Sequence, residues 1–210
     1  MAHHPQAEPA TPSTQERIRS IASVLFAERG YGGTSMSQIA QQVGISKAGL
    51  YNYYTSKEAL FTELVTRCME AWIAVSQAPL REATGYRQRL WEHFRASVSF
   101  TREHPHEVAL LRLAVILVGG ERGERVQQPL EGFKVKYLED LDSFFRQAVA
   151  DGALDAAGDP PTLALTFSVF LDGVLFNTMF GDPLDKHLDQ HLETLFQPLW
   201  RGLGGQPGAR

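Results

Sequence analysis

The section between residues 35 and 53 carries side chains suited to binding a charged polymer. Its second half contains a lysine, two small residues and three side chains that can form hydrogen bonds: Lys47, Ala48, Gly49, Tyr51, Asn52 and Tyr53. A helix that enters the major groove of DNA, about 12 Å wide, needs small side chains where it approaches the bases. It also needs donors for phosphates and base edges. This set of residue types therefore favours DNA binding.

Two short helices are expected to position these side chains. Ser35 and Gln38 have the spacing of a capping box, which opens the first helix. The apolar stripe of that helix is Met36, Ile39, Ala40 and Val43. Gly44 permits a tight turn, Ser46 can cap the second helix, and the small side chain of Ala40 lets the two helices cross closely. The pattern is that of a helix-turn-helix.

Further helices are expected on both sides of this motif. Ser13 and Glu16 form another capping box, and the helix that it opens should end at Gly30. The apolar face of this helix is Ile18, Ile21, Ala22, Leu25 and Phe26. After the motif, residues 55–58 offer a cap for a long helix with one apolar side.

The remainder of the chain also has helical periodicity, and no alternating strand pattern is sustained. Helices are expected near 86–103, 106–118, 128–151, 161–180 and 183–202. Prolines lie at or near their starts, at Pro105, Pro129, Pro160, Pro161 and Pro183. The charged, glycine-rich stretch 119–127 is expected to be a mobile loop. About nine helices with short connections predict an all-α fold, in which a C-terminal helical bundle follows the helix-turn-helix domain.

The distribution of charge limits where DNA could bind. The net charge is −4, but residues 1–60 have a slight basic excess, whereas residues 61–210 are acidic. Any DNA contact should therefore come from the N-terminal quarter. No stretch approaches the roughly 18 uninterrupted apolar residues of a membrane span. Residues 1–12 have no signal-peptide core and suit a disordered tail, so we expect a cytoplasmic protein that does not bind membranes.

Side chains that could support other chemistry are few. Cys68 is the one cysteine, which excludes an intramolecular disulfide, and its apolar surroundings predict a packing role. His187 and His191 have the i, i+4 spacing of a chelating pair, but no third ligand is fixed by spacing, so a solvated surface is favoured. No glycine-rich phosphate loop and no nucleophile–base pair is found. An enzyme is therefore disfavoured, and neither a metal nor a cofactor is predicted.

Three blocks of the sequence resemble one known family. They are residues 30–40 (GYGGTSMSQIA), 44–54 (GISKAGLYNYY) and 56–60 (SKEAL). Together they resemble the DNA-binding domain of the TetR (tetracycline repressor) family. A generic helix-turn-helix does not bring the second and third blocks into register. One departure is Tyr54, where the family more often has phenylalanine.

The resemblance implies contacts with double-stranded operator DNA for individual side chains. Contacts with phosphates or the groove edge would come from Ser35, Ser37, Tyr51, Tyr53 and Lys57. Base edges would be met by Lys47, Ala48 and Gly49. Ser46 and Asn52 complete the candidate DNA-binding set. Phosphate contacts would set the position of the protein, and base contacts would supply specificity.

The resemblance also implies a second domain, at residues 59–203, after the DNA-binding domain at 13–58. In the family this domain forms a homodimer interface and an effector pocket, and residues 204–210 are expected to be a flexible C-terminus. Apolar stripes on the last two helices could pair across a two-fold axis, although packing within one chain is the alternative. The candidate interface residues are Val169, Phe170, Gly173, Val174, Asn177, Leu192, Leu195, Phe196 and Leu199. Two-fold symmetry would place two recognition helices roughly 34–36 Å apart and predicts a palindromic operator.

Aromatic side chains of the second domain could line the effector pocket, because ligand sites are mostly apolar with few polar anchors. The candidate pocket residues are Trp72, Trp91, Phe94, Phe133, Tyr137, Phe144, Asp172 and Phe176. Asp172 lies in an apolar run, where it could pair with a cationic ligand or form a hydrogen bond between helices. The predicted function is a transcriptional repressor released from DNA by an apolar or amphipathic small-molecule effector. The alternatives are an activator of the same family and a helical adaptor that binds protein.

Overall fold

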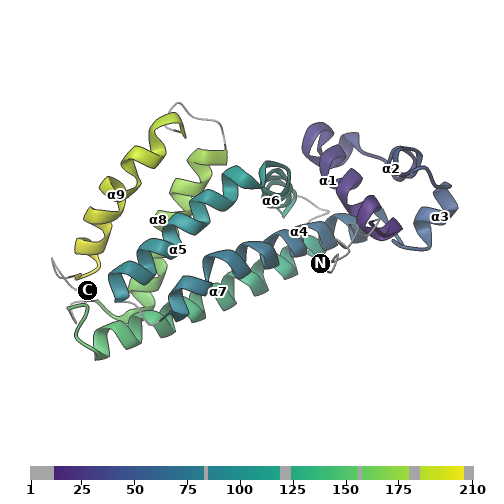
Figure 1. The fold of residues 1–210 in the computed structure, drawn as a ribbon. Helices are drawn as coiled ribbons and strands as arrows, with labels where there is room; N and C mark the ends of the chain where they lie inside the picture. Colours follow the sequence, from purple (N-terminus) through teal and green to yellow (C-terminus); the bar gives the residue numbers. More distant parts are fainter. Residues whose placement is uncertain (1–11, 83–84, 119–123, 156–157, 180–184, 206–210) are drawn as a thin grey trace, which may run out of the picture. The chain divides into compact units, whose positions relative to one another are not determined.

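The computed structural model describes residues 12–82, 85–118, 124–155, 158–179 and 185–205, and the side chains of 118, 124–127, 179 and 185–190 fall outside this description. Within these residues the fold is all-α, as predicted, with nine α-helices and one 3₁₀ turn (Figure 1). In chain order they are α1 (Thr14–Gly33), α2 (Met36–Val43), α3 (Lys47–Tyr51), α4 (Lys57–Ser76), η1 (Ala78–Arg81), α5 (Tyr86–Glu103), α6 (Pro105–Val118), α7 (Glu124–Ala150), α8 (Pro160–Met179) and α9 (Asp185–Gly202).

The chain divides into two compact units, Met1–Leu64 and Val65–Arg210. The sequence predicts a boundary after Glu58, at the start of α4, whereas the division falls inside that helix. The first turns of α4 belong to the first unit because the ring of Phe61 packs 5.2 Å from that of Phe26 and 5.1 Å from that of Tyr31.

In the first unit, α1 begins with the predicted capping box. The Ser13 hydroxyl accepts a hydrogen bond from the Glu16 N–H at 3.2 Å, and the Glu16 carboxylate accepts one from the Ser13 N–H at 2.6 Å. The predicted end at Gly30 is only a kink, with φ 70° and ψ 170°, and the helix resumes as far as Gly33. Four buried side chains of α1 form one wall of the core: Ile18, Ala22, Leu25 and Phe26.

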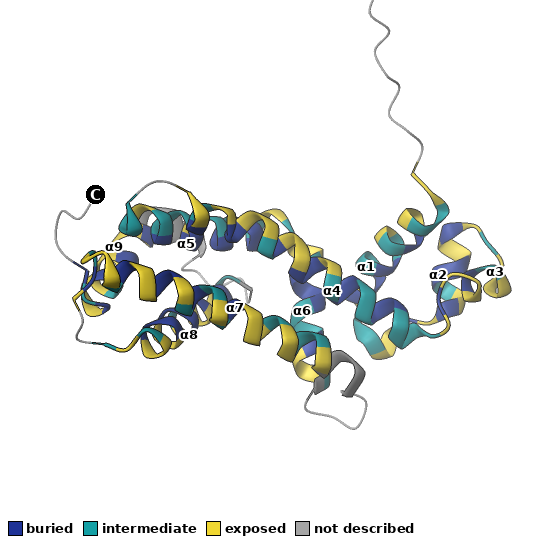
Figure 2. Ribbon diagram, turned by 90° about the horizontal axis from the view of Figure 1, so that it is seen from below, coloured by how far each residue is buried: buried dark blue, intermediate teal, exposed yellow. Residues whose placement is uncertain are grey.

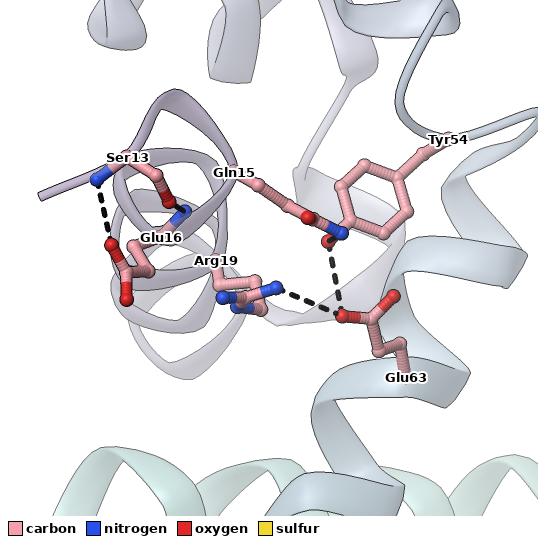
Figure 3. A network of polar contacts seen from close by, with 6 residues as sticks. All are labelled: Ser13, Gln15, Glu16, Arg19, Tyr54 and Glu63. Atoms are coloured by element: carbon pink, nitrogen blue, oxygen red, sulfur yellow. Dashed lines mark hydrogen bonds and ion pairs between the residues drawn. The ribbon is translucent and has the colours of Figure 1, made fainter.

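A chain of polar contacts joins α1 to the start of α4 (Figure 3). Glu63 Oε1 accepts hydrogen bonds from Arg19 Nη1 at 3.3 Å and from the Tyr54 hydroxyl at 3.2 Å. Gln15 Nε2 lies 3.5 Å from the Tyr54 oxygen. Burial raises the pKa of Tyr54, so its hydroxyl stays protonated and can donate. The hydroxyl by which Tyr54 departs from phenylalanine therefore has a specific partner in Glu63.

The second unit is a helical bundle with an aromatic core. Helices α7 and α8 lie against each other, and α5 packs against both η1 and α8 (Figure 1). The largest fully buried side chains of this unit are Phe94, Phe145, Phe167, Phe196 and Trp200. Burying a side chain of this size contributes about 1.5–3 kcal/mol each, which makes this core the main source of the stability of the unit.

Three predictions about loops and ends need correction or lie outside the described residues. Residues 124–127, predicted as loop, form the start of α7, so Pro129 lies inside the helix, where its missing N–H costs a hydrogen bond. Residues 119–123, the predicted tail at 1–11, and Pro183 lie outside the described residues. Two residues of the predicted flexible C-terminus are fixed, since Asp155 N–H donates to Gly204 O and Gly205 N–H donates to Trp200 O, both at 2.9 Å.

Helix α8 has one buried side and one exposed apolar side. Its buried side consists of Leu163, Ala164, Phe167 and Leu171, whereas Leu165, Val169 and Phe176 are at least half exposed. By length and composition alone, Pro160–Thr178 could cross a membrane, with a mean hydropathy of 1.2 and 33% of the window buried. Asp172 would be expensive in lipid, so this composition fits a helix that packs in a bundle better than a membrane span.

Candidate nucleic-acid interface and ligand cavity

The turn between α2 and α3 is built around Gly44. Its φ of 79° and ψ of 32° lie in the left-handed region, which glycine adopts without the steric cost of a Cβ. The Gly44 N–H donates to the carbonyls of Ala40 at 3.0 Å and Gln41 at 3.2 Å, and the Ile45 N–H donates to Ala40 O at 3.0 Å. From α1, the Arg17 guanidinium donates to the last carbonyl of α2, that of Val43. These bonds fix the angle at which α3 leaves α2.

Helix α3 is held from below and leaves one side in solvent. The Ser46 hydroxyl accepts a hydrogen bond from the Gly49 N–H at 2.9 Å, which caps the helix, and Leu50 is fully buried beneath it. On the outer side, Tyr51 is 42% exposed and Tyr53, just beyond the helix, is 46% exposed. Lys47, Ala48 and Asn52 are also exposed, whereas Gly49 is half-buried. Figure 2 shows much of α3 in the colour of exposed residues. Five of the six predicted residues between 47 and 53 are therefore accessible to solvent.

The two serines at the start of α2 are both exposed, but their hydroxyls are used differently. Ser35 is the N-cap: its hydroxyl accepts from the Gln38 N–H at 3.3 Å, while Gln38 Oε1 accepts from the Ser35 N–H at 2.8 Å. Ser37 lies in the first turn of the helix with its side chain toward solvent. Both serines would therefore contact a phosphate from the N-terminal end of α2, which the capping box stabilises.

Lys57 has a local role that the sequence did not predict. Its ammonium group donates to the carbonyls of Tyr31 at 2.7 Å and Thr34 at 2.9 Å, and it lies 4.3 Å from the centroid of the Tyr31 ring. The Thr34 hydroxyl, which is buried, lies 2.9 Å from Gly30 O and 3.0 Å from Leu25 O. Lys57 thus ties the start of α4 to the α1–α2 connection, and a phosphate would compete with those two carbonyls.

A cavity of about 360 Å³ lies within the second unit. Five helices contribute its lining residues, which are Met69, Trp72, Phe100, Thr101, Val108, Leu111, Val115, Leu130, Phe133, Lys134, Tyr137, Ser168, Asp172, Leu175 and Phe176. The walls are mostly apolar and the polar groups are few. This volume and composition suit a small organic molecule.

The structure brings together only part of the predicted pocket. Trp72, Phe133, Tyr137, Asp172 and Phe176 line the cavity. Trp91 and Phe94 instead pack against Phe196 of α9, with ring centroids 5.2 and 5.8 Å from it. Phe144 lines a separate polar hollow beside Arg89. Helical periodicity identifies these residues as apolar-facing, but it does not say which neighbouring helix each one meets.

Sequence reasoning missed His93, which lies behind the cavity wall. His93 is fully buried, with Nδ1 2.6 Å from the Ser76 carbonyl oxygen and Nε2 2.9 Å from the Tyr137 hydroxyl. Burial lowers the pKa of His93 to about 4, so the imidazole is neutral at neutral pH. The available signal was its position inside the apolar stripe of α5, between Leu90 and Phe94.

The predicted dimer-interface residues differ in exposure. Val169, Gly173, Asn177 and Leu195 are exposed, and Phe170, Val174 and Leu199 are half-buried. Leu192 and Phe196 belong to the core of their own unit, where Phe196 is fully buried. A side chain without exposed surface has nothing to offer a partner, so these two positions contribute only by supporting the residues around them.

The two histidines and the cysteine considered as candidates from the sequence take no part in the two sites described above. His191 is exposed, and the side chain of His187 lies outside the described residues. Among the residues that the structure describes, no three His, Cys, Asp or Glu side chains are grouped closely enough to hold a metal ion. Burial raises the pKa of Cys68 to about 12, so its thiol stays protonated inside the core.

Comparison with known proteins bears on the first unit most directly. Residues 18–64 match the family model described as bacterial regulatory proteins, tetR family. The matched segment contains most of α1, all of α2 and α3, and the first turns of α4. It therefore coincides with the helix-turn-helix and the core beneath it.

Two curated relatives extend the similarity to different lengths. The chain is 29% identical over 107 residues to the HTH-type transcriptional regulator RutR of Escherichia coli (strain K12), covering 51% of this chain and 50% of RutR. It is 27% identical over 191 residues to the HTH-type transcriptional activator FasR of Mycolicibacterium smegmatis, covering 90% of this chain and 82% of FasR. The chain thus spans about half the length of RutR and most of the length of FasR.

A solved structure carries the similarity through both units. That structure is AibR in complex with isovaleryl coenzyme A and operator DNA, with a TM-score of 0.64, 25% identity, and coverage of 88% of this chain and 98% of AibR. The helix-turn-helix geometry, the family match and these relatives agree. Residues 18–64 therefore form a DNA-binding domain of the tetR type, and the chain is similar to TetR-family regulators over most of its length.

Proposed function

We propose that this protein is a ligand-responsive transcriptional repressor that binds a palindromic operator as a homodimer and leaves it when a small molecule occupies the cavity. The observation that carries the proposal is the outer side of α3, where Lys47, Tyr51 and Tyr53 are exposed above the buried anchor Leu50. Packing alone does not explain an exposed lysine and tyrosine on this five-residue helix and a second exposed tyrosine just beyond it. Contacts with DNA phosphates and base edges would explain them.

In the proposed complex, Lys47, Ala48 and Gly49 lie against base edges and the two tyrosine hydroxyls contact phosphates. Residues 1–60 have only a slight basic excess, so one copy of this domain would gain little affinity from counterion release. Two copies on one operator would double the number of phosphate contacts. The weak charge of a single domain therefore supports a dimer.

The dimer is proposed to form through the exposed apolar side of α8 together with α9. Leu165 and Val169, one helical turn apart on α8, are 50% and 60% exposed, and Leu195 of α9 is 38% exposed. Exposed apolar side chains that gather in one patch mark an interaction site. A two-fold axis brings the same patch of two protomers together and buries both copies at once.

The apolar cavity supports the proposed effector. AibR is described with an acyl coenzyme A and operator DNA, which shows that this fold can carry both ligands in that protein. An effector would release DNA only if it bound the DNA-free arrangement more tightly than the DNA-bound one. Activation of transcription is the alternative to repression, because the relative FasR is named an activator. Binding to operator DNA places the protein in the cytoplasm.

A gel-shift titration against the DNA upstream of the gene tests the proposal. The wild-type chain should shift that DNA, and Lys47→Ala with Tyr51→Ala should weaken binding at least ~100-fold, since each lost contact is worth about 1–3 kcal/mol. The matched control is Lys136→Ala, an exposed lysine of α7, which should bind like the wild type. Equal binding by the double variant would refute the role of α3. A reporter fused to the same DNA separates repression from activation.

A further inference from the structure

We infer that the cavity selects an apolar effector that carries a protonated amine, held between the hydroxyl oxygen of Tyr137 and the carboxylate of Asp172. The inference rests on the proposed effector role of the cavity and specifies the chemistry of its ligand. It follows from the direction of the buried hydrogen bonds and from the sign of the charge beside them.

The hydrogen bonds behind the cavity wall have one possible direction. A carbonyl oxygen only accepts, so His93 Nδ1, 2.6 Å from Ser76 O, must carry the proton of the imidazole. A neutral imidazole has one such proton, and burial keeps His93 neutral because it lowers the pKa to about 4. Nε2 is therefore an acceptor. The Tyr137 hydroxyl, 2.9 Å away, donates its one proton to it.

This direction fixes what Tyr137 can offer a ligand. The side chain is 4% exposed and lines the cavity. Burial raises its pKa well above the ordinary value, so the proton toward His93 is retained. The remaining lone pairs of the oxygen can only accept. A ligand carbonyl or carboxylate beside Tyr137 and Asp172 would face two groups that accept hydrogen bonds. A ligand donor could instead form a hydrogen bond with each of them.

Asp172 places a negative charge in the lining of the same cavity. It lines the cavity from α8, one helical turn from Ser168 on one side and Phe176 on the other, and both of these line it too. Its negative charge raises the pKa of Tyr137, which means that its field reaches the hydroxyl. Burial raises the pKa of Asp172 itself, while the charge of Lys134 lowers it. A ligand cation beside Asp172 would offset the free-energy cost of keeping its carboxylate charged there.

The charged and aromatic groups around the cavity suit an amine, while the indole N–H of Trp72, which is buried without a hydrogen-bond partner among the described residues, can donate to a ligand oxygen. Lys134 and Asp172 are both exposed lining residues whose charges interact, so a ligand anion beside Lys134 would also face the carboxylate of Asp172. The ring of Trp72, which also lines the cavity, has its centroid 5.6 Å from that of Phe133 and 5.1 Å from that of Tyr137. These rings can contact an apolar body and also favour a nearby ammonium group.

Three probes with one apolar body and different head groups test the inference: 4-phenylbutylamine, 4-phenylbutan-1-ol and 4-phenylbutanoate. Calorimetric titration of the full chain should show the amine binding at least ~10-fold more tightly than the carboxylate, with the alcohol between them. Asp172→Asn should weaken amine binding about 10-fold and reduce the difference in affinity between the amine and 4-phenylbutanoate. Glu139→Gln, an exposed acidic residue of α7 outside the lining, is the matched control and should change neither.

Tyr137→Phe should weaken the amine and the alcohol while leaving the carboxylate unchanged or tighter. Thermal melting checks that this variant is folded, and Asp172→Asn, at an exposed position, keeps the test decisive if it is not. A carboxylate that binds as tightly as the amine, or an amine affinity unchanged in Asp172→Asn, overturns the inference. If no probe binds while the gel shift persists, the inference fails and the DNA-binding function stands. A missing gel shift contradicts the proposed function instead.

Discussion

The two units differ in how their candidate functional side chains relate to the core. In the first unit, Lys47, Tyr51 and Tyr53 are exposed and the core lies beneath them. In the second unit, Trp72 and Tyr137 line the cavity and are also buried core residues. The recognition surface can therefore change with little effect on folding, whereas a change at Trp72 or Tyr137 alters stability as well as the cavity.

The largest effect should come from truncating a residue that is both cavity wall and core. Trp72→Ala removes a side chain that is 7% exposed and should lower the free energy of unfolding by about 3–5 kcal/mol. Val75→Ala, on the exposed side of the same helix, should change it by less than about 0.5 kcal/mol. Urea unfolding measures both. A Trp72→Ala variant as stable as the wild type would break the comparison.

Acid should destabilise the protein through His93. The native state keeps His93 neutral until its pKa of about 4, whereas in the unfolded chain the imidazole is protonated near its ordinary pKa of 6.5. As the pH falls from 6.5 to 4 the unfolded state binds more protons, so stability drops by about 1.4 kcal/mol per pH unit, roughly 3 kcal/mol in all. His93→Gln should lack this loss. Urea unfolding at a series of pH values gives a stability profile for each protein, and the difference between the two profiles separates the effect of His93 from the titration of carboxyl groups. Parallel profiles would contradict this prediction.

A charge on the exposed side of α8 should disrupt the dimer without unfolding the protomer. Val169→Glu places a carboxylate in the proposed interface, where a buried, unpaired charge is costly, so dimer dissociation should increase at least ~100-fold. Light scattering after gel filtration gives the mass of the particle. Val135→Glu, on the exposed side of α7, is the matched control and should stay dimeric. A dimer that survives Val169→Glu would place the interface elsewhere.

The smallest effect expected is at the start of α2. Ser35→Ala removes the hydroxyl that accepts from the Gln38 N–H and should cost about 1 kcal/mol of stability. Ser37→Ala, at an exposed position two residues later, should cost much less, because Ser37 is not the cap. Thermal melting compares them. Equal losses would mean that the capping box does not hold this helix end.

Local chemistry made the first unit predictable. The capping boxes at Ser13 and Ser35 and the left-handed turn at Gly44 are decided within a few residues, and the structure has them where the sequence predicts them. The position of the domain boundary was harder to predict from the sequence. Helical periodicity continues unbroken through α4, and only the packing of Phe61 against Phe26 assigns its first turns to the first unit.

Contacts between distant segments limited prediction in the second unit. Trp72 and Trp91 look alike as apolar residues on a helix, yet one lines the cavity and the other packs on Phe196. The hydrogen bond between His93 and Tyr137 joins residues 44 positions apart, beyond the reach of any local pattern. Glu124 lies at the start of α7 although its neighbourhood is charged and rich in glycine, because a long helix overrides weak local preference.

Hydroxyl-radical footprinting on the operator recovered by gel shift tests the central claim most directly, namely that two copies of α3 read one palindromic site. The account predicts two protected patches whose centres lie one DNA turn apart, roughly 34–36 Å, and which both disappear with Lys47→Ala and Tyr51→Ala. A single protected patch, or unchanged protection by the double variant, would contradict it.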